Sequence, residues 1–345
     1  MLTKSIAALL VSWVLTLLLL RGARRFQWVD RPNRRSSHSL PTPTLGGIAI
    51  LLGTLTGLWL NDVPDFDALV LASGVLVLIV VDDIGRPIAA RTKLLLQILT
   101  GALWVTMVSL PPIQLPGIGS VSGWVLSILA VFWLISWMNV FNFMDGIDAI
   151  SGTQTIVAGV SLAILLGRYS AEHQILPLTL VCAVAGFLIF NLPPARIFMG
   201  DVGSAFLGLC FGVVTLQAII NGAHVLVAIL PLSAYLYDTG LTIVRRAWRR
   251  ENVLQAHREH LYQRLSQRGW SHGWICLAVI GIGSMLGVAA VGLSRGDIFW
   301  PVLLSATASG LLITGSVSTW HQKDGQTDQL LDQSTDQSTI SWTDQ

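Results

Sequence analysis

Eleven apolar stretches, each approaching the length of a membrane-spanning helix, follow one another along this sequence. They lie near residues 5–20, 44–60, 67–81, 94–110, 122–138, 151–167, 175–191, 204–220, 224–243, 273–293 and 298–316. A helix needs about 20 mainly apolar residues to cross a bilayer. Charged residues make up only 12% of the chain, against roughly 25% in an average soluble domain. We therefore expect an all-α polytopic membrane helix bundle with about 11 transmembrane helices.

The end of the chain has a different composition. Residues 321–345 consist mostly of Gln, Asp, Ser and Thr. A segment with so little apolar content cannot bury enough surface to fold. The sequence therefore predicts a polytopic membrane domain over residues 1–320 and a disordered polar tail over residues 321–345.

Basic residues indicate the orientation of the bundle. All but three of the 21 Lys and Arg residues fall on one side of the expected spans, and the exceptions are Lys4, Arg168 and Arg295. Because basic loops stay on the cytoplasmic side, we expect the N-terminus outside and the C-terminus inside. The arginines after the ninth stretch are interpreted as anchors of this kind: Arg245, Arg246, Arg249 and Arg250.

Carboxylates from distant stretches are expected at the same cytoplasmic boundary. They are Asp82 and Asp83 after the third stretch, Asp145 and Asp148 after the fifth, and Asp201 after the seventh. Charged groups at a membrane are costly and usually functional. Beside positive charge they indicate a divalent cation and a phosphate, because Mg²⁺ takes oxygen ligands and commonly shares one or two carboxylates with substrate phosphate and water.

Asp201 is the candidate metal ligand among these. Gly200 and Gly203 flank it, and glycines allow a phosphate to come close to the backbone. The helix expected to begin at Gly203 would also favour an anion at its N-terminus. The alternative is a helix cap with glycines for tight packing.

The adjacent pair Asp82 and Asp83 is a second candidate. Two neighbouring carboxylates repel each other, and one tends to keep its proton unless a cation intervenes. This arrangement favours either a metal-bridging role or a general-base role. The alternative is an ordinary loop.

Two amides precede the carboxylates that follow the fifth apolar stretch, in the series Asn139, Asn142, Asp145, Asp148. Neighbours in this series share a helix face, but the direction drifts by about 180° over the three steps. The four side chains therefore cannot form one stripe on a straight helix, and a helix that ends in a turn at Gly146 fits better. A helix cap with a solvated loop is the alternative.

Two loops carry candidate anion-binding groups. His257 and His260 lie on either side of Arg258, and such groups can bind a pyrophosphate. Zinc is disfavoured there, because the loop has no Cys and Glu259 is expected to point away. In the first loop, Arg35 and His38 could meet an anionic headgroup or a nucleotide, with simple attraction to the leaflet as the alternative.

Taken in order, five motifs resemble those of the polyprenyl-phosphate N-acetylhexosamine-1-phosphate transferases. They are Asp30 to Gly47, Val81 to Gly85, Asn139 to Asp148, Phe198 to Gly208, and His257 to Arg264. The His-Arg-Glu-His form resembles the O-antigen-initiating branch of this superfamily. It differs from the triple-histidine run of the peptidoglycan translocase, which argues against a muramoyl-pentapeptide substrate.

The resemblance implies a reaction and roles for the motif residues. A UDP-N-acetylhexosamine would give its sugar-1-phosphate to undecaprenyl phosphate and release UMP, in a cleft facing the cytoplasm of a bacterial inner membrane, with the N-terminus in the periplasm. Asp201 would hold Mg²⁺, or Mn²⁺ in its place, and Asp82 and Asp83 would lie by the lipid phosphate. The other implied contacts are Asn139, Asn142, Asp145 and Asp148 with the nucleotide, Phe198 stacked on uracil, and His257, Arg258 and His260 with the pyrophosphate.

Several points stay open at this level. Direct attack by the lipid phosphate is preferred to an acyl-phosphate intermediate on an aspartate, because a lipid phosphate is already a nucleophile near neutral pH. A lipid-linked sugar flippase is the alternative function. It would carry charges in mid-span and often visible inverted repeats, neither of which is prominent here. A homodimer is expected from the family, and no nucleic acid partner is expected.

Overall fold

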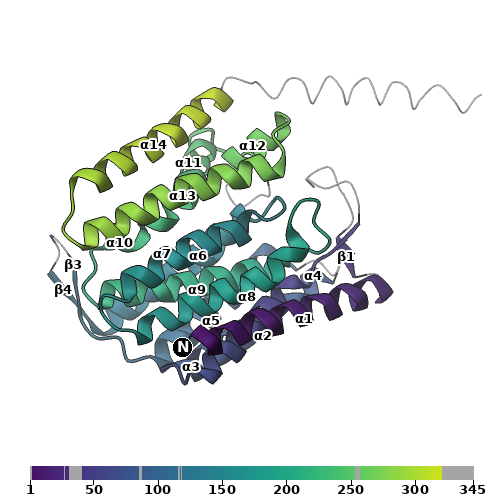
Figure 1. Cartoon of the computed structure of the whole chain (residues 1–345), viewed down its shortest axis with the longest axis horizontal. Helices are drawn as coiled ribbons and strands as arrows, with labels where there is room; N and C mark the ends of the chain where they lie inside the picture. The colour runs from purple at the N-terminus through teal and green to yellow at the C-terminus, as the bar shows by residue number, and fades with distance from the viewer. Residues whose placement is uncertain are drawn as a thin grey trace, which may run out of the picture.

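The computed structural model describes residues 2–26, 28–30, 41–84, 88–115, 117, 119–252 and 257–320. The long helices lie side by side in a bundle (Figure 1). The helices are α1 (Leu2–Phe26), α2 (Gly46–Leu60), α3 (Phe66–Val77), α4 (Val80–Asp83), α5 (Ala90–Met107), α6 (Gly123–Met144), α7 (Ile150–Leu166), α8 (Ile175–Asn191), α9 (Gly200–Ile220), α10 (Val225–Ile229), α11 (Ser233–Trp248), α12 (Leu261–Gln267), α13 (His272–Ser294) and α14 (Phe299–Trp320). The 3₁₀ turns are η1 (Glu172–Gln174) and η2 (Leu230–Leu232).

Two small antiparallel hairpins are the only strands in the described part of the chain. Strand β1 (Val29–Asp30) pairs with β2 (Thr42–Pro43), with Val29 opposite Pro43. Strand β3 (Ile113–Leu115) pairs with β4 (Gly119–Val121), with Gln114 opposite Ser120. The all-α class expected from the sequence is confirmed.

Seven helical segments are long and apolar enough to cross a membrane. They are α1, α6, η1 with α8, α9, α10 through α11, α13 and α14. Helices α2, α3 and α7 are apolar but shorter. Every stretch expected to span is helical over most of its length, which establishes a polytopic membrane protein, while the number of eleven spans stays a prediction.

Helix α9 lies at the centre of the bundle and is the most deeply buried of the seven. Its first turn packs directly on α2, where a Cβ added at Gly47 would lie 2.3 Å from Gly203 Cα. Further along, the ring of Phe211 stacks on Phe141 of α6, with centroids 5.0 Å apart. Helix α9 is therefore fixed from two sides, and the residues at its N-terminus have a rigid support.

The ends of the bundle carry different elements. The N-terminus of α1 lies at the end with the β3–β4 hairpin, and α4, α12 and β1 lie at the other end (Figure 1). The C-terminal turn of α14 is tied to α12, because Arg264 and Arg268 donate to the carbonyl oxygens of Thr319 and Ser318. The start of α1 and the end of α14 thus lie at opposite ends of the bundle, while the orientation predicted from the basic residues stays a prediction. The tail over residues 321–345 lies outside the described residues.

Candidate active site

A pocket of about 490 Å³ lies at the end of the bundle that carries α4 and α12. Helices α5, α6 and α9 supply most of its walls. The segment before α12 supplies the two histidines, and α12 itself supplies Tyr262 and Gln263. The polar and titratable residues that line it are Arg91, Lys93, Gln97, Asn139, Asn142, Asp201, His257, His260, Tyr262 and Gln263. Five of the thirteen side chains predicted from the sequence therefore share one cavity.

Lys93 is the charge at the centre of this pocket. Its Nζ lies 2.5 Å from Asp82 Oδ2 and 2.5 Å from Asp201 Oδ2. The second oxygen of Asp82 accepts from the backbone N–H of Ile88. Because Lys93 is in the first turn of α5, its ammonium links this helix to carboxylates of α4 and α9. The two aspartates converge, as predicted, on Lys93, for which the sequence alone predicts only a basic loop residue.

The hydrogen-bond partners of Asp83 differ from those of its neighbour Asp82. Its carboxylate accepts the backbone N–H groups of Asp201 at 2.8 Å and Val202 at 3.2 Å. Burial, followed by the negative charge of Asp201, raises the pKa of Asp83 to about 8. The sequence predicts an anion at the N-terminus of α9, and the group that contacts this N-terminus here is the side chain of Asp83.

Glycine is required at the point where Asp83 meets α9. Gly200 has φ +72°, a left-handed conformation, and a Cβ there would lie 2.4 Å from Thr44 O and 2.5 Å from Asp83 Oδ1. Thr44 also donates its hydroxyl to the carbonyl oxygen of Asp83. The Gly200–Asp201 step therefore serves close contact with a carboxylate of the same chain.

The amides of α6 point into the pocket from its last two turns. Asn142 Nδ2 donates to Asp201 Oδ1 at 3.0 Å and to Ser204 Oγ at 3.1 Å. Asn139 Nδ2 donates to Gln97 Oε1 at 2.8 Å. Both oxygens of Asp201 are thus engaged, one by Asn142 and one by Lys93.

The carboxylates after α6 do not line the pocket, because the helix ends before them. Helix α6 ends at Met144, so Asp145 and Gly146 form the expected turn. Burial is the main cause that raises the pKa of Asp145 to about 7. Asp148 Oδ2 accepts from Ala195 N–H at 3.1 Å and lies 3.3 Å from His272 Nδ1. Asp148 therefore joins the loop before α9 to α13, and its nucleotide role stays a prediction.

The histidines reach the pocket through an anchored segment. His257 and His260 both line the cavity, with ring centroids 5.0 Å apart. Asp238 of α11 accepts from Leu261 N–H at 2.8 Å and Tyr262 N–H at 3.3 Å. Tyr262 OH in turn donates to Phe143 O at 3.0 Å. The start of α12 is thereby fixed to both α11 and α6.

Burial is the main cause that lowers the pKa of His257, to about 4. Burial also raises the pKa of Tyr262 well above its ordinary value. Near neutral pH the ring of His257 is therefore uncharged in the ligand-free protein.

Glu259 turns away from the histidines, as expected. Its carboxylate lies 2.6 Å from Arg246 Nη1 and 3.3 Å from Arg249 Nη1. Arg245 and Arg246 are both buried. Of the four arginines interpreted as membrane anchors, Arg246 therefore also makes a structural contact, because its buried guanidinium pairs with the carboxylate of Glu259.

The remaining predicted site residues are placed as follows. Phe198 is half-buried beside the start of α2, where its carbonyl accepts from Gly46 N–H at 3.0 Å and its N–H donates to Pro43 O. Neither Phe198 nor Arg258 lines the pocket. Their contacts with uracil and pyrophosphate stay predictions. Arg35 and His38 lie outside the described residues.

The residues of the pocket fit a Mg²⁺ ion bound together with substrate. Within the described residues, no three His, Cys, Asp or Glu side chains are grouped closely enough to form a protein-only metal site. Asp82 and Asp201 nevertheless meet at one cation, Lys93 Nζ. Mg²⁺ commonly uses one or two carboxylates and takes its other ligands from phosphate and water.

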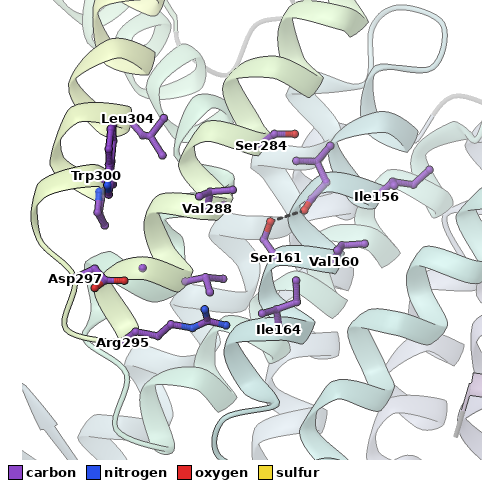
Figure 2. Close-up of a pocket in the computed structure, with 15 residues that line it drawn as sticks. Ile156, Val160, Ser161, Ile164, Ser284, Val288, Arg295, Asp297, Trp300 and Leu304 are labelled. Atoms are coloured by element: carbon purple, nitrogen blue, oxygen red, sulfur yellow. Dashed lines mark hydrogen bonds between the residues drawn. The ribbon is translucent and has the colours of Figure 1, made fainter.

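A larger groove lies elsewhere, between α7, α13 and α14 (Figure 2). Its volume is about 820 Å³, and apolar side chains such as Ile156, Val160 and Leu304 form most of its wall. Arg295 and Asp297 are its only charged lining residues. It lacks the converging carboxylates and histidines of the smaller pocket, so the smaller pocket is the candidate active site.

Two residues of the site were missed or unexplained at the level of sequence. Lys93 was available as a signal, because it follows Arg91 at the start of an otherwise apolar stretch and faces the Asp82 boundary. Asp238 is a carboxylate inside the ninth apolar stretch. Its partners at the start of α12 lie more than 20 residues further along the chain. Pairing across such a distance is set by tertiary structure.

Comparison with known proteins gives a consistent picture. Residues 66–219 match the glycosyl transferase family 4 profile. The chain is 26% identical to a probable undecaprenyl-phosphate N-acetylglucosaminyl 1-phosphate transferase of Bacillus subtilis, with 85% of each chain covered. It is 29% identical to the decaprenyl-phosphate N-acetylglucosaminephosphotransferase of Mycolicibacterium smegmatis, over 86% of this chain and 81% of the relative. A phospho-N-acetylmuramoyl-pentapeptide-transferase of Streptococcus pyogenes is 30% identical, over 51% of this chain and 59% of the relative.

Proposed function

Because this chain belongs to the family of polyprenyl-phosphate N-acetylhexosamine-1-phosphate transferases, we propose that it transfers N-acetylhexosamine-1-phosphate from a UDP-sugar to undecaprenyl phosphate and releases UMP. The observation that carries this proposal is that Lys93 and Asp201 line one pocket with His257 and His260, and that Lys93 joins Asp201 to Asp82. Transfer between two phosphates depends on alignment and neutralised charge more than on covalent help. The pocket offers cationic and hydrogen-bonding groups for both.

The chemical step is a single displacement. An oxygen of the lipid phosphate forms a bond to the β-phosphorus of the UDP-sugar, and the bond from that phosphorus to the oxygen bridging to the α-phosphate breaks. UMP leaves with that oxygen, and the sugar becomes linked to the lipid through a pyrophosphate. No proton is required in the step when the lipid phosphate enters as the dianion, and Asp82 would orient it or accept its proton if it enters as the monoanion.

Asp82 suits this position better than Asp83. Asp82 faces Lys93 at the pocket, whereas both carboxylate oxygens of Asp83 accept backbone N–H groups of α9. Because the backbone of α9 holds both oxygens of Asp83, its side chain is not free to turn toward a substrate in the pocket. Asp83 therefore holds the first turn of α9, and with it Asp201, in place.

The other groups of the pocket either contact the donor substrate or hold neighbouring side chains in place. Lys93, His257 and His260 would contact the pyrophosphate, because cations and N–H donors bind phosphate oxygens strongly. Asn139 and Asn142 keep Gln97 and Asp201 in their positions through hydrogen bonds. Mg²⁺ held by Asp201 with Asp82 would neutralise charge that develops on the phosphate oxygens during transfer.

UDP-N-acetylglucosamine is the first donor to test, because the names of the Bacillus subtilis and Mycolicibacterium smegmatis relatives specify N-acetylglucosamine. The lipid product would initiate an O-antigen or a related cell-envelope glycan at the cytoplasmic face of a bacterial inner membrane. A flippase without transferase activity is not supported, since the charged groups gather at one end of the bundle in a site suited to phosphate chemistry.

The test is UMP release by purified protein in detergent, with undecaprenyl phosphate and a panel of UDP-N-acetylhexosamines. We expect release that requires the lipid and Mg²⁺ and disappears in Asp201→Asn. Folding of that variant would be checked by its thermal unfolding temperature. No UMP from any donor, from protein that remains folded, would contradict the proposal.

A further inference from the structure

A carboxylate outside the pocket lies within hydrogen-bond distance of one of the pocket's histidines. Asp238 lies in α11, is 5% exposed, and does not line the cavity. Its Oδ1 lies 3.3 Å from His260 Nδ1 and also accepts from Leu261 N–H at 2.8 Å. Its Oδ2 accepts from Tyr262 N–H at 3.3 Å. One side chain therefore holds both the ring of His260 and the first turn of the helix that follows it.

This contact fixes the proton on the ring of His260. A carboxylate only accepts hydrogen bonds, so the nitrogen that faces Asp238 is the protonated one, Nδ1. The other nitrogen, Nε2, is then left for a ligand in the pocket that His260 lines. Neighbouring rings also hold the imidazole in its plane, with centroid distances of 5.0 Å to His257, 5.9 Å to Tyr262 and 6.0 Å to Phe143.

We propose that Asp238 is a positioning residue for the transfer reaction, which keeps the proton on Nδ1 of His260 and directs the ring so that Nε2, once it is also protonated when substrate binds, donates to the substrate phosphates. This inference rests on the proposed transferase function. It also accounts for a carboxylate inside an apolar helix, where an acid is costly and commonly serves function. Asp238 touches neither substrate nor reacting atoms, and its effect passes through His260.

A purely structural role makes a different prediction. If Asp238 only satisfied the backbone of α12, its loss would lower stability and would act independently of His260. Groups that act as one unit are instead strongly non-additive in their effect on catalysis. The double variant therefore separates the two roles.

The experiment compares Asp238→Asn, His260→Ala and the double variant with the wild-type full chain in detergent. We expect Asp238→Asn to lose about 10- to 100-fold in kcat/KM, as partners that orient a ligating histidine commonly do. The double variant should be no slower than His260→Ala alone. Tyr237→Phe is the matched control, because Tyr237 is the adjacent residue of α11. Its hydroxyl lies 3.2 Å from Ser316 Oγ of α14, outside the pocket. Tyr237→Phe should retain wild-type kcat/KM.

The histidine ring can also be observed without turnover. In ¹⁵N spectra of histidine-labelled protein, the His260 signals are identified by their loss in His260→Gln. We expect the Nδ1–H tautomer in the wild type and its loss in Asp238→Asn. An unchanged tautomer in Asp238→Asn, or losses in kcat/KM that multiply in the double variant, would overturn the inference. If wild-type protein released no UMP, the proposed function would fail, and the spectra would still decide how Asp238 acts on His260.

Discussion

Lys93 Nζ lies 2.5 Å from Asp201 Oδ2, although 108 positions separate the two residues in the sequence. The same nitrogen also contacts Asp82. A cation at this junction holds two carboxylates together that would otherwise repel each other. It also lies where the phosphates of a UDP-sugar and a lipid would need positive charge.

Lys93→Gln should remove most of the transferase activity. The variant leaves two carboxylates at the pocket without their shared cation, and loss of one electrostatic group of this kind commonly costs about 100-fold or more in kcat. The measurement is the rate of UMP release at saturating substrates. Arg168→Gln is the matched control, because its guanidinium is exposed and donates to Ser294, outside the pocket. Similar rates for Lys93→Gln and wild type would remove Lys93 from the account.

Asp82→Asn should lower activity, whereas Asp83→Asn should lower stability. Asp82→Asn loses the carboxylate at the lipid phosphate, so kcat should fall while the unfolding temperature stays close to wild type. Asp83→Asn replaces one of two acceptors for the backbone of α9 with a donor, which should cost about 1–2 kcal/mol of stability. Activity and thermal unfolding, measured on both variants, check this division. Equal losses of stability with equal losses of kcat would contradict it.

Gly200→Ala should destabilise the first turn of α9. The left-handed φ of +72° alone costs roughly 1–2 kcal/mol for a residue with a Cβ, and the new methyl group would collide with Thr44 O and Asp83 Oδ1. Gly281→Ala is the control, because Gly281 lies within α13 and a Cβ there meets nothing within 4 Å. Thermal unfolding should show a lower midpoint for Gly200→Ala only. Equal midpoints in the two variants would refute the described contact.

Binding of UDP-N-acetylglucosamine should strengthen as the pH falls from 8 to 6. Burial holds the pKa of His257 near 4 in the free protein, and a bound pyrophosphate would raise that pKa by favouring the charged ring. A group whose pKa rises on binding takes up a proton, so affinity increases toward low pH. Calorimetry of wild type and His257→Gln across this range measures the effect. The same pH slope in both proteins would exclude His257 as its source.

The sequence was sufficient for the helical class and for most of the surroundings of Asp201. Apolar length identifies helices directly, and the helical drift over Asn139 to Asp148 correctly favoured a helix end before Gly146 over one continuous stripe. The partner of each charge was harder to predict. Lys93, Asp238 and the buried Arg246 each pair with a residue that approaches only after the helices have packed, so no local pattern in the sequence specifies their roles.

The most direct test of the central claim follows the β-phosphate of the donor. Purified protein would be given UDP-N-acetylglucosamine labelled with ³²P at the β-phosphate, together with undecaprenyl phosphate and Mg²⁺, and the products would be separated into lipid and aqueous fractions. We predict that the label enters the lipid fraction and that the released UMP is unlabelled, with neither change in Lys93→Gln or Asp201→Asn. Label that leaves in UDP would mean transfer of the sugar without its phosphate, and it would contradict the assignment of this pocket as a phosphoryl-transfer site.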